Sequence, residues 1–156
     1  MLNPGLQQTQ IDLFKTKIMK RITLVTGLLI IHACICAQSN AMDKINALTK
    51  EMEQDFNANN MLKVSAVYLD TAAMLGGGMN VTGREGIDAY WMSLKDKSAS
   101  WKLETDKIED YDKVVIQRGR SYLSSASGMK SNVRFILIWK KVGNSYRILY
   151  DSFTRL

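Results

Sequence analysis

The sequence predicts an α+β domain in which about three N-terminal helices cover one face of a strongly curved, mostly antiparallel sheet. Helical periodicity is confined to the segments that come first after residue 37, and strand-like runs dominate the rest of the chain, which is the order of an α+β fold. The last two runs, 134–141 and 145–153, are joined through a Gly-Asn pair that is typical of a β-hairpin. Because a strongly curved sheet does not close flat onto helices, we expect a pocket between the two layers.

The closing hairpin is apolar on both faces, which is typical of strands at the centre of a sheet. If its loop is Gly143-Asn144 alone, Trp139 faces Ile148, Leu137 faces Tyr150 and Phe135 faces Ser152. The opposite face then carries Ile136, Ile138, Leu149, Asp151 and Phe153.

Residues 1–37 have the pattern of a secretory signal peptide. Four basic residues precede the apolar run 22–33, and the small residue Ala37 ends the stretch. The run is shorter than the roughly 20 residues that span a bilayer, so we expect an exported protein, periplasmic or secreted, without a membrane span. Met19 is an alternative start. A lipoprotein anchored through Cys34 is an alternative to cleavage after Ala37.

Removing residues 1–37 changes the chemistry of the remaining domain, 38–156. The segment carries four basic residues and one acidic residue, so the net charge falls from +6 to +3. The remaining basic residues are scattered, which argues against nucleic-acid binding. Both cysteines and the single histidine, His32, also lie in the removed segment. The domain therefore lacks the side chains for disulfides, for Cys- or His-ligated metals and haem, and for nucleophilic triads, and we expect no metal and no cofactor.

Three helices are expected before most of the strands. Ser39 or Asn40 can cap a helix that runs to about Asn57, with apolar residues at helical spacing, and 61–66 can form a short second helix. Thr82 and Glu85 have the spacing of a capping box at the start of a third helix. The apolar stripe of the first helix is Met42, Ile45, Leu48, Met52 and Phe56, and the buried face of the third is Ile87, Tyr90 or Trp91, and Leu94.

Four strands are expected besides a first one over 67–75, which Gly76-Gly77-Gly78 ends in a turn. They cover 100–109, 113–124 and the two strands of the closing hairpin, with a polar loop over 124–130. Gly119 in mid-strand indicates a bulge or a close approach by another group. Gly76-Gly77-Gly78 lacks the context of a phosphate-binding loop.

Several short motifs, taken in order, resemble the nuclear-transport-factor-2-like (NTF2-like) superfamily, and within it the SnoaL-like and ketosteroid-isomerase-like proteins. They are Tyr68-x-Asp70, the glycines 76–78, the run 81–91 (VTGREGIDAYW), Trp101, the run 138–141 (IWKK), and Tyr146-Arg147-Ile148-x-x-Asp151. The resemblance covers about 40–153. It implies a cone-shaped α+β fold with a deep pocket, often in homodimers. It also implies that an Asp base and neutral donors would carry any isomerase-type chemistry.

Two carboxylates are candidate catalytic residues. Asp70 interrupts an apolar strand, and burial there would raise its pKa into the range of a general base; the alternative is that it caps or turns the strand. Asp151 lies among apolar residues and could act as a second acid or oxyanion donor, or as a structural carboxylate.

Six aromatic residues are candidate ligand contacts, because amphipathic rings suit a flat apolar ligand, although rings at these spacings also form cores. Arg118 and Arg120 could neutralise an anionic ligand, or lie on a solvated, salt-bridged surface. We expect a small, largely apolar organic molecule as ligand, with an isomerase or dehydratase and an inactive dimerisation or partner-binding module as alternatives. The six aromatic candidates are Tyr68, Tyr90, Trp91, Trp101, Tyr122 and Trp139.

Overall fold

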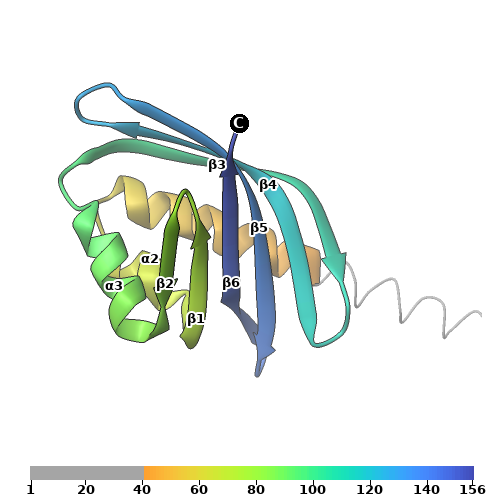
Figure 1. The fold of residues 1–156 in the computed structure, drawn as a ribbon. Coiled ribbons are helices and arrows are strands. Elements are labelled where there is room, and N and C mark those ends of the chain that lie inside the picture. Colours follow the sequence, from red (N-terminus) through yellow and green to blue (C-terminus); the bar gives the residue numbers. More distant parts are fainter. Residues whose placement is uncertain (1–40) are drawn as a thin grey trace, which may run out of the picture. The chain divides into compact units, whose positions relative to one another are not determined.

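The computed structural model describes residues 41–156, which form three helices and one six-stranded sheet (Figure 1). The predicted signal peptide, 1–37, and Cys34 within it lie outside the described residues. The first helix is described over 41–57 and is followed by α2 (Met61–Ala66), whose bounds are those predicted. The α+β class is therefore confirmed.

The third helix, α3 (Gly83–Ser93), begins directly after a short strand that was not predicted from the sequence. Thr82 occupies its N-cap position, but the Thr82 side chain makes no capping hydrogen bond, so the predicted capping box is not formed. Thr82 is also the last residue of that strand, where it is extended and pairs with Ala73. The buried face of α3 is centred on Ile87 and Trp91, as predicted.

The six strands form one curved, open sheet in the order β2-β1-β6-β5-β4-β3. Neighbouring strands are antiparallel except for β1 and β6, which are parallel. The prediction of a mostly antiparallel sheet is thus confirmed. The strands are β1 (Tyr68–Gly76), β2 (Met79–Thr82), β3 (Ser98–Asp110), β4 (Val114–Ser125), β5 (Lys130–Val142) and β6 (Ser145–Arg155).

Gly119 lies where Glu104 of β3 and the Phe135 ring of β5 leave no room for a side chain on β4. The β3–β4 register shifts between Thr105 and Lys107, directly beside the pair Thr105–Gly119. A Cβ atom at Gly119 would lie 2.2 Å from the Glu104 carbonyl oxygen and 2.5 Å from a Phe135 ring carbon. Only glycine fits there, so the expectation of a bulge or a close approach at this position is confirmed.

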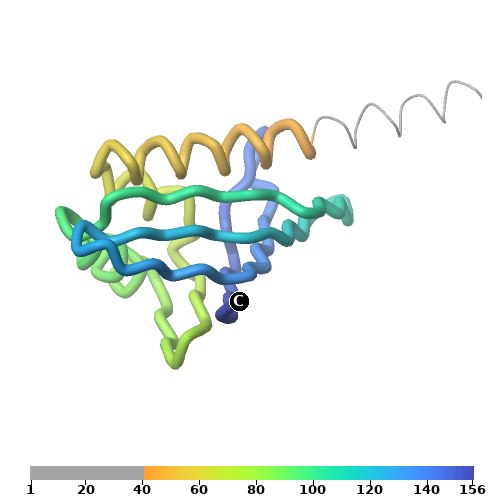
Figure 2. The backbone as a smooth tube through the Cα atoms, turned by 90° about the horizontal axis from the view of Figure 1, so that it is seen from above, coloured from red at the N-terminus to blue at the C-terminus, as the bar shows by residue number. Residues whose placement is uncertain are grey.

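A buried polar network ties the first helix to the sheet, beside which it runs in Figure 2. The Gln117 side chain is fully buried; its Nε2 donates to Thr49 Oγ1 (3.0 Å) and Thr105 Oγ1 (2.8 Å). Its Oε1 accepts from Trp139 Nε1 (2.9 Å). Because every member of such a network is hydrogen-bonded, it fixes the position of the helix without leaving an unpaired buried group.

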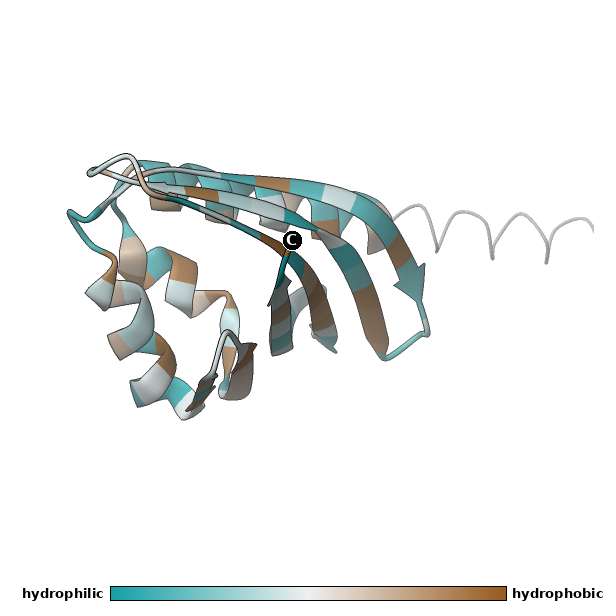
Figure 3. Cartoon of the chain, turned by 45° about the horizontal axis from the view of Figure 1, so that its top comes forward, coloured by the Kyte–Doolittle hydropathy of each residue, from teal (hydrophilic) through white to brown (hydrophobic). Residues whose placement is uncertain are grey.

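The buried stripe of the first helix differs from the prediction at one end. Ile45, Met52 and Phe56 are buried, whereas Met42 is 42% exposed and Thr49 takes a buried place through its bond to Gln117. Hydrophobic and hydrophilic residues alternate along the long strands (Figure 3), and in β5 buried positions alternate with more exposed ones. None of the helices within residues 41–156 has the length and apolar character needed to cross a membrane.

Candidate functional site

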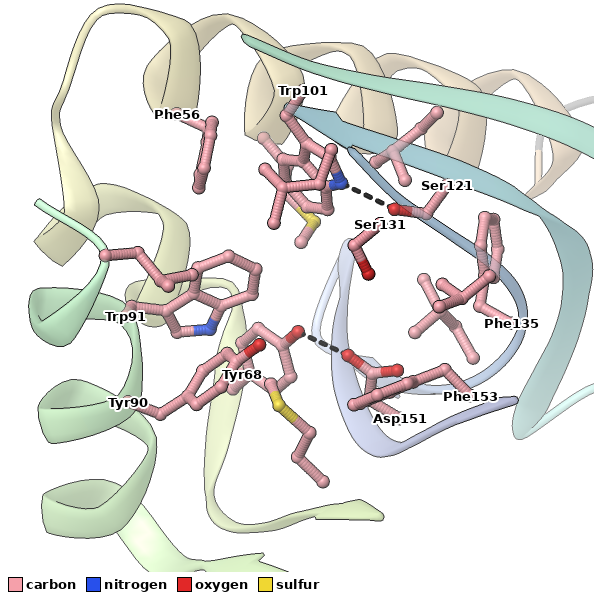
Figure 4. A pocket seen from close by; sticks show the side chains of 17 residues that line it. Phe56, Tyr68, Tyr90, Trp91, Trp101, Ser121, Ser131, Phe135, Asp151 and Phe153 are labelled. Carbon is pink, nitrogen blue, oxygen red and sulfur yellow. Dashed lines mark hydrogen bonds between the residues drawn. The ribbon is translucent and has the colours of Figure 1, made fainter. Parts of the chain in front are cut away.

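The concave face of the sheet, the first helix and α3 enclose a cavity of about 90 Å³. Its wall is almost entirely apolar and aromatic, with one carboxylate, that of Asp151. Figure 4 shows this carboxylate facing the aromatic side chains across the cavity. The lining residues are Met52, Phe56, Tyr68, Met74, Tyr90, Trp91, Leu94, Trp101, Leu103, Ser121, Leu123, Ser131, Val133, Phe135, Leu137, Asp151 and Phe153.

A bulge in β6 turns Asp151 into this cavity. Trp139 pairs with Ile148, as predicted, but Ile138 pairs with Tyr150, so Leu149 is an extra residue between the two pairs. Since strand faces alternate at every residue, one extra residue exchanges the faces of all that follow. The predicted pairing of Leu137 with Tyr150 is therefore wrong: Leu137 pairs with Asp151, and Tyr150 is 45% exposed.

Asp151 lies on a central strand with buried neighbours on both sides. It pairs with Leu137 on β5 and with Met74 on β1, and it is 9% exposed. Burial raises the pKa of Asp151 from its ordinary 3.8 to about 6, and a hydrogen bond from Tyr68 opposes that rise. The carboxyl group is thus protonated in mildly acid solution and ionised above about pH 6.

The hydroxyl of Tyr68 donates to Asp151 Oδ2 at 2.7 Å, and both groups are buried. Burial, and then the charge of Asp151, raise the pKa of Tyr68 well above its ordinary value, so its hydroxyl remains a donor. Asp151 keeps its second oxygen free of any hydrogen bond to residues 41–156. That oxygen can accept a hydrogen bond from a ligand, or donate one when the carboxyl is protonated.

Two further donors converge on the same end of the cavity (Figure 4). Burial, followed by the charge of Asp151, raises the pKa of Tyr90 to about 12. Trp91 Nε1 is buried and lies close enough to the Tyr68 hydroxyl to lower the pKa of Tyr68, but it makes no hydrogen bond of ordinary geometry within the described residues. An unpaired buried donor is costly, so a ligand acceptor placed beside Asp151 would relieve that cost.

Trp91 is also the centre of an aromatic cluster. Its ring lies 5.3 Å from those of Tyr90 and Trp101 and about 6 Å from those of Phe56 and Tyr68, in edge-on and tilted arrangements. Across the cavity, Trp101 Nε1 donates to Ser121 Oγ at 2.7 Å. This packing holds the apolar wall in place around the polar end.

Comparisons with solved structures identify the architecture. An NTF-2 like protein from Shewanella oneidensis MR-1 superposes with a TM-score of 0.66 at 18% identity, covering 72% of this chain and 98% of its own. For an NTF2-like protein with a cystatin-like fold from Novosphingobium aromaticivorans the TM-score is 0.68 at 13% identity, and the match covers 80% of this chain and 87% of that protein. For a ketosteroid isomerase-like protein from Erwinia carotovora atroseptica the TM-score is 0.61 at 15% identity, and the match covers 73% of this chain and 95% of that protein.

The chain has the NTF2-like fold. This confirms the fold that its motifs suggested. No protein-family model matches the sequence, and no curated protein is similar to it in sequence. At these identities the likeness concerns the fold, and the chemistry has to be argued from the residues of the site.

In this NTF2-like domain Asp70 does not reach the cavity, and the expectation that it is buried is wrong. Its side chain is 88% exposed and accepts from Arg84 Nε at 3.1 Å. The cause is local, since the β1–β6 register is interrupted between Tyr68 and Ala73, and Asp70 lies in that irregular segment. The physical reason for assigning it as a base, burial in an apolar strand, is therefore absent.

Arg84 instead anchors the start of β1. Its guanidinium donates to the carbonyl oxygens of Ser65 (2.8 Å) and Tyr68 (2.5 Å) and to Asp88 (3.0 Å), besides Asp70. These bonds connect α2, β1 and α3. They fix the backbone of Tyr68, whose hydroxyl holds Asp151.

Four of the six aromatic candidates line the cavity, namely Tyr68, Tyr90, Trp91 and Trp101. Trp139 and Tyr122 do not. Trp139 is fully buried in the core against Gln117, beyond the bulge. Tyr122 lies between Ser121 and Leu123, which both line the cavity, so the alternation of β4 directs it to the other face.

Arg118 and Arg120 lie on a salt-bridged surface, which was one of the two alternatives expected for them. Arg118 pairs with Glu109, and Arg120 Nη2 lies 2.9 Å from Asp106 Oδ1. Neither lines the cavity. Within residues 41–156 no group of three or more acidic, His or Cys side chains is placed to hold a metal ion.

Several cavity residues, chiefly Ser121 and Ser131, were not predicted from the sequence. Gln117, Gly119, Ser121 and Leu123 alternate along β4, a signal that would have placed Ser121 on the inner face. Ser131 lies between the predicted loop 124–130 and the predicted strand 134–141, whereas β5 begins at Lys130. No comparable signal marked the bulge at Leu149.

Proposed function

We propose that the cavity binds a small, largely apolar organic molecule and holds one polar group of it against Asp151. The observation that carries the proposal is a single carboxylate, buried and bonded to Tyr68, at one end of an otherwise apolar cavity. Pockets of this composition typically bind small organic ligands, with a few polar groups fixing their orientation. The unpaired Trp91 Nε1 and the Tyr90 hydroxyl favour a ligand oxygen at that end.

The size of the cavity constrains the ligand. A volume of about 90 Å³ suits a compact group or one ring. It is well below the roughly 300–1,000 Å³ of pockets that enclose drug-sized ligands. A larger ligand would therefore place one end inside and extend through the mouth of the cavity, where Leu94, Leu123 and Ser131 lie.

Titration of the protein with steroids, polyketides and aromatic acids tests the proposal. Trp91 and Trp101 line the cavity, so we expect a bound ligand to change tryptophan fluorescence and to raise the unfolding temperature. Ser131→Phe, which narrows the mouth, should weaken binding about tenfold or more. The matched control Ser152→Phe, at an exposed position of β6, should bind as the wild type does.

Two outcomes would contradict this function. One is a panel in which no compound changes either signal. The other is a ligand whose affinity is the same for Ser131→Phe and for the wild type, which would place binding elsewhere.

The same carboxyl favours proton transfer as a second candidate function. A buried Asp with a pKa of about 6 can take up and return a proton near neutral pH, as an isomerase or dehydratase requires. Asp151 would be the proton shuttle, and Tyr68 or Tyr90 would donate to the developing oxyanion.

Once a substrate is found, Asp151→Asn should lower kcat about a hundredfold or more, because the amide neither accepts nor returns the proton. The exposed Asp70→Asn is the matched control and should retain turnover. Undiminished turnover in Asp151→Asn would eliminate the proton-shuttle role.

A dimerisation or partner-binding module with a vestigial pocket is less well supported, since side chains would then fill the cavity. Homodimer formation and export through residues 1–37 stay predictions. The described residues bear on neither.

A further inference from the structure

A second hollow, called the vestibule below, continues from the mouth of the cavity. It measures about 610 Å³ and shares Leu94, Leu123 and Ser131 with the cavity, so the two spaces are adjacent. Its walls come from the segment after α3, the facing ends of β4 and β5, and the end of β6. The remaining vestibule residues are Lys97, Ser98, Ser125, Met129, Lys130, Asn132, Arg155 and Leu156.

Three cationic side chains and no acidic side chain line the vestibule. Lys97, Lys130 and Arg155 form no ion pair with any residue of 41–156. On the outer surface, Lys102, Lys107, Arg118 and Arg120 each pair with a carboxylate. Lys113, Lys140 and Lys141, at the far end of β4 and β5, form no ion pair within residues 41–156 either. Asp96, the neighbour of Lys97 in the chain, accepts from Asn59 and does not line the vestibule.

Backbone hydrogen bonds hold the three cations around the same opening. The Lys97 carbonyl accepts from the Ala126 amide at 3.0 Å, which joins the segment after α3 to the β4–β5 turn. Lys130 pairs with Ser124 on β4. Arg155 pairs with Val133 on β5, and the next amide, that of Leu156, donates to the Asn132 carbonyl at 3.0 Å.

One strand connects the two polar ends of the combined space. Asp151, Phe153 and Arg155 alternate on β6; the first two line the cavity and the third lines the vestibule. Four residues of a strand span about 13 Å. A ligand that touches both ends therefore has polar groups about 13 Å apart and an apolar body between them.

We propose that the ligand is an amphiphilic organic anion, whose acidic group lies among Lys97, Lys130 and Arg155 while its apolar body enters the cavity toward Asp151. The inference rests on the proposed binding function and adds the charge and polarity of the ligand. Cations in a concave site raise the local concentration of anions and orient them as they enter. The pairing of a carboxylate or sulfonate with arginine and lysine supplies the outer contact.

Two fluorescent probes that differ by one charged group test the inference. 8-Anilinonaphthalene-1-sulfonate is the anion, and N-phenyl-1-naphthylamine has the same skeleton without the sulfonate. We expect the wild-type protein to bind the anion more tightly. The triple variant Lys97→Gln/Lys130→Gln/Arg155→Gln replaces all three cations. It should bind the anionic probe about tenfold more weakly and the neutral probe with unchanged affinity. High salt should lower the affinity for the anionic probe and leave that for the neutral probe unchanged.

The matched control is Lys113→Gln/Lys140→Gln/Lys141→Gln, which removes the same charge from exposed positions at the far end of β4 and β5. Lys140 lies ten positions after Lys130 on β5, about 33 Å along the strand. This variant should bind both probes as the wild type does. An equal loss of anion binding in the two triple variants would show a general charge effect and overturn the inference.

The remaining outcomes separate the inference from the proposed function. If both probes bind but the vestibule variant binds the anion normally, the inference fails and the binding function stands. If neither probe binds the wild type, both fail. Binding to vesicles of phosphatidylcholine with phosphatidylglycerol tests the alternative that the three cations bind a membrane surface. Vesicle binding that depends on the three cations, with probe binding that does not, would assign them to a membrane surface and overturn the inference.

Discussion

Replacing Asp151 with asparagine is expected to stabilise the protein at pH 8 by about 3 kcal/mol. The pKa of Asp151 is raised from 3.8 to about 6 in the folded state. The folded protein therefore holds a proton that the unfolded chain releases between about pH 4 and pH 6, and the free energy of unfolding falls as the pH rises through that window. Each pKa unit corresponds to about 1.4 kcal/mol, which gives about 3 kcal/mol above pH 6.

Urea unfolding at pH 4 and pH 8 checks this prediction. The wild type should lose stability between the two pH values relative to Asp151→Asn, and the two proteins should have nearly equal stability at pH 4. The exposed Asp70→Asn is the control and should change stability by no more than about 1 kcal/mol at either pH. A variant of Asp151 that is less stable than the wild type at pH 8 would show that the carboxylate stabilises the fold, contrary to this account.

A stabilising substitution at a buried position would itself be informative. Proteins retain costly buried charges mostly where function requires them. Asp151 lies on a central strand between Leu137 and Met74. An apolar or amide side chain at this position would pack as well as the carboxylate does. The stability cost of the carboxylate is therefore an argument for its use in binding or proton transfer.

Tyr68→Phe is expected to lower stability by about 1.5–3 kcal/mol at pH 8, the usual worth of a buried hydrogen bond to a charged group. It should also raise the pKa of Asp151 further above its ordinary value, because the bond from Tyr68 is what opposes the effect of burial. At pH 4, where the carboxyl is protonated in both proteins, the loss should be smaller.

Unfolding curves at the two pH values measure this effect, with Tyr146→Phe as the control. Tyr146 is also buried, but its hydroxyl makes no side-chain hydrogen bond within the described residues, so its removal should cost less and show no such pH dependence. If the two variants lose equal stability at pH 8, the Tyr68 hydroxyl does not hold the carboxylate.

Local patterns in the sequence predicted most of the fold. Helix α2 has the predicted bounds, and the strands of the hairpin and the position of Gly119 follow from apolar alternation and turn chemistry. The parallel pairing of β1 with β6 was not predicted, because it joins segments about eighty residues apart whose contact leaves no local signal. Strand β2 was missed because it is only four residues long.

The site was harder to predict than the fold because two irregularities decide which carboxylate is inside. A regular hairpin would have turned Asp151 away from Leu137, and the bulge at Leu149 reverses that. A regular β1 would have favoured a buried Asp70, and the interrupted register after Tyr68 leaves it in solvent. Both events depend on how distant strands meet, whereas the aromatic wall at Trp91 and Trp101 could be anticipated from residue type.

Titration of the Asp151 carboxyl by carbon-13 NMR, with its signal assigned by comparison with Asp151→Asn, tests the central claim most directly. We expect a midpoint of about pH 6, set by burial of the carboxyl group in an apolar cavity. A midpoint near pH 4, the value of a carboxyl in water, would show that Asp151 is solvated and would contradict the site proposed here.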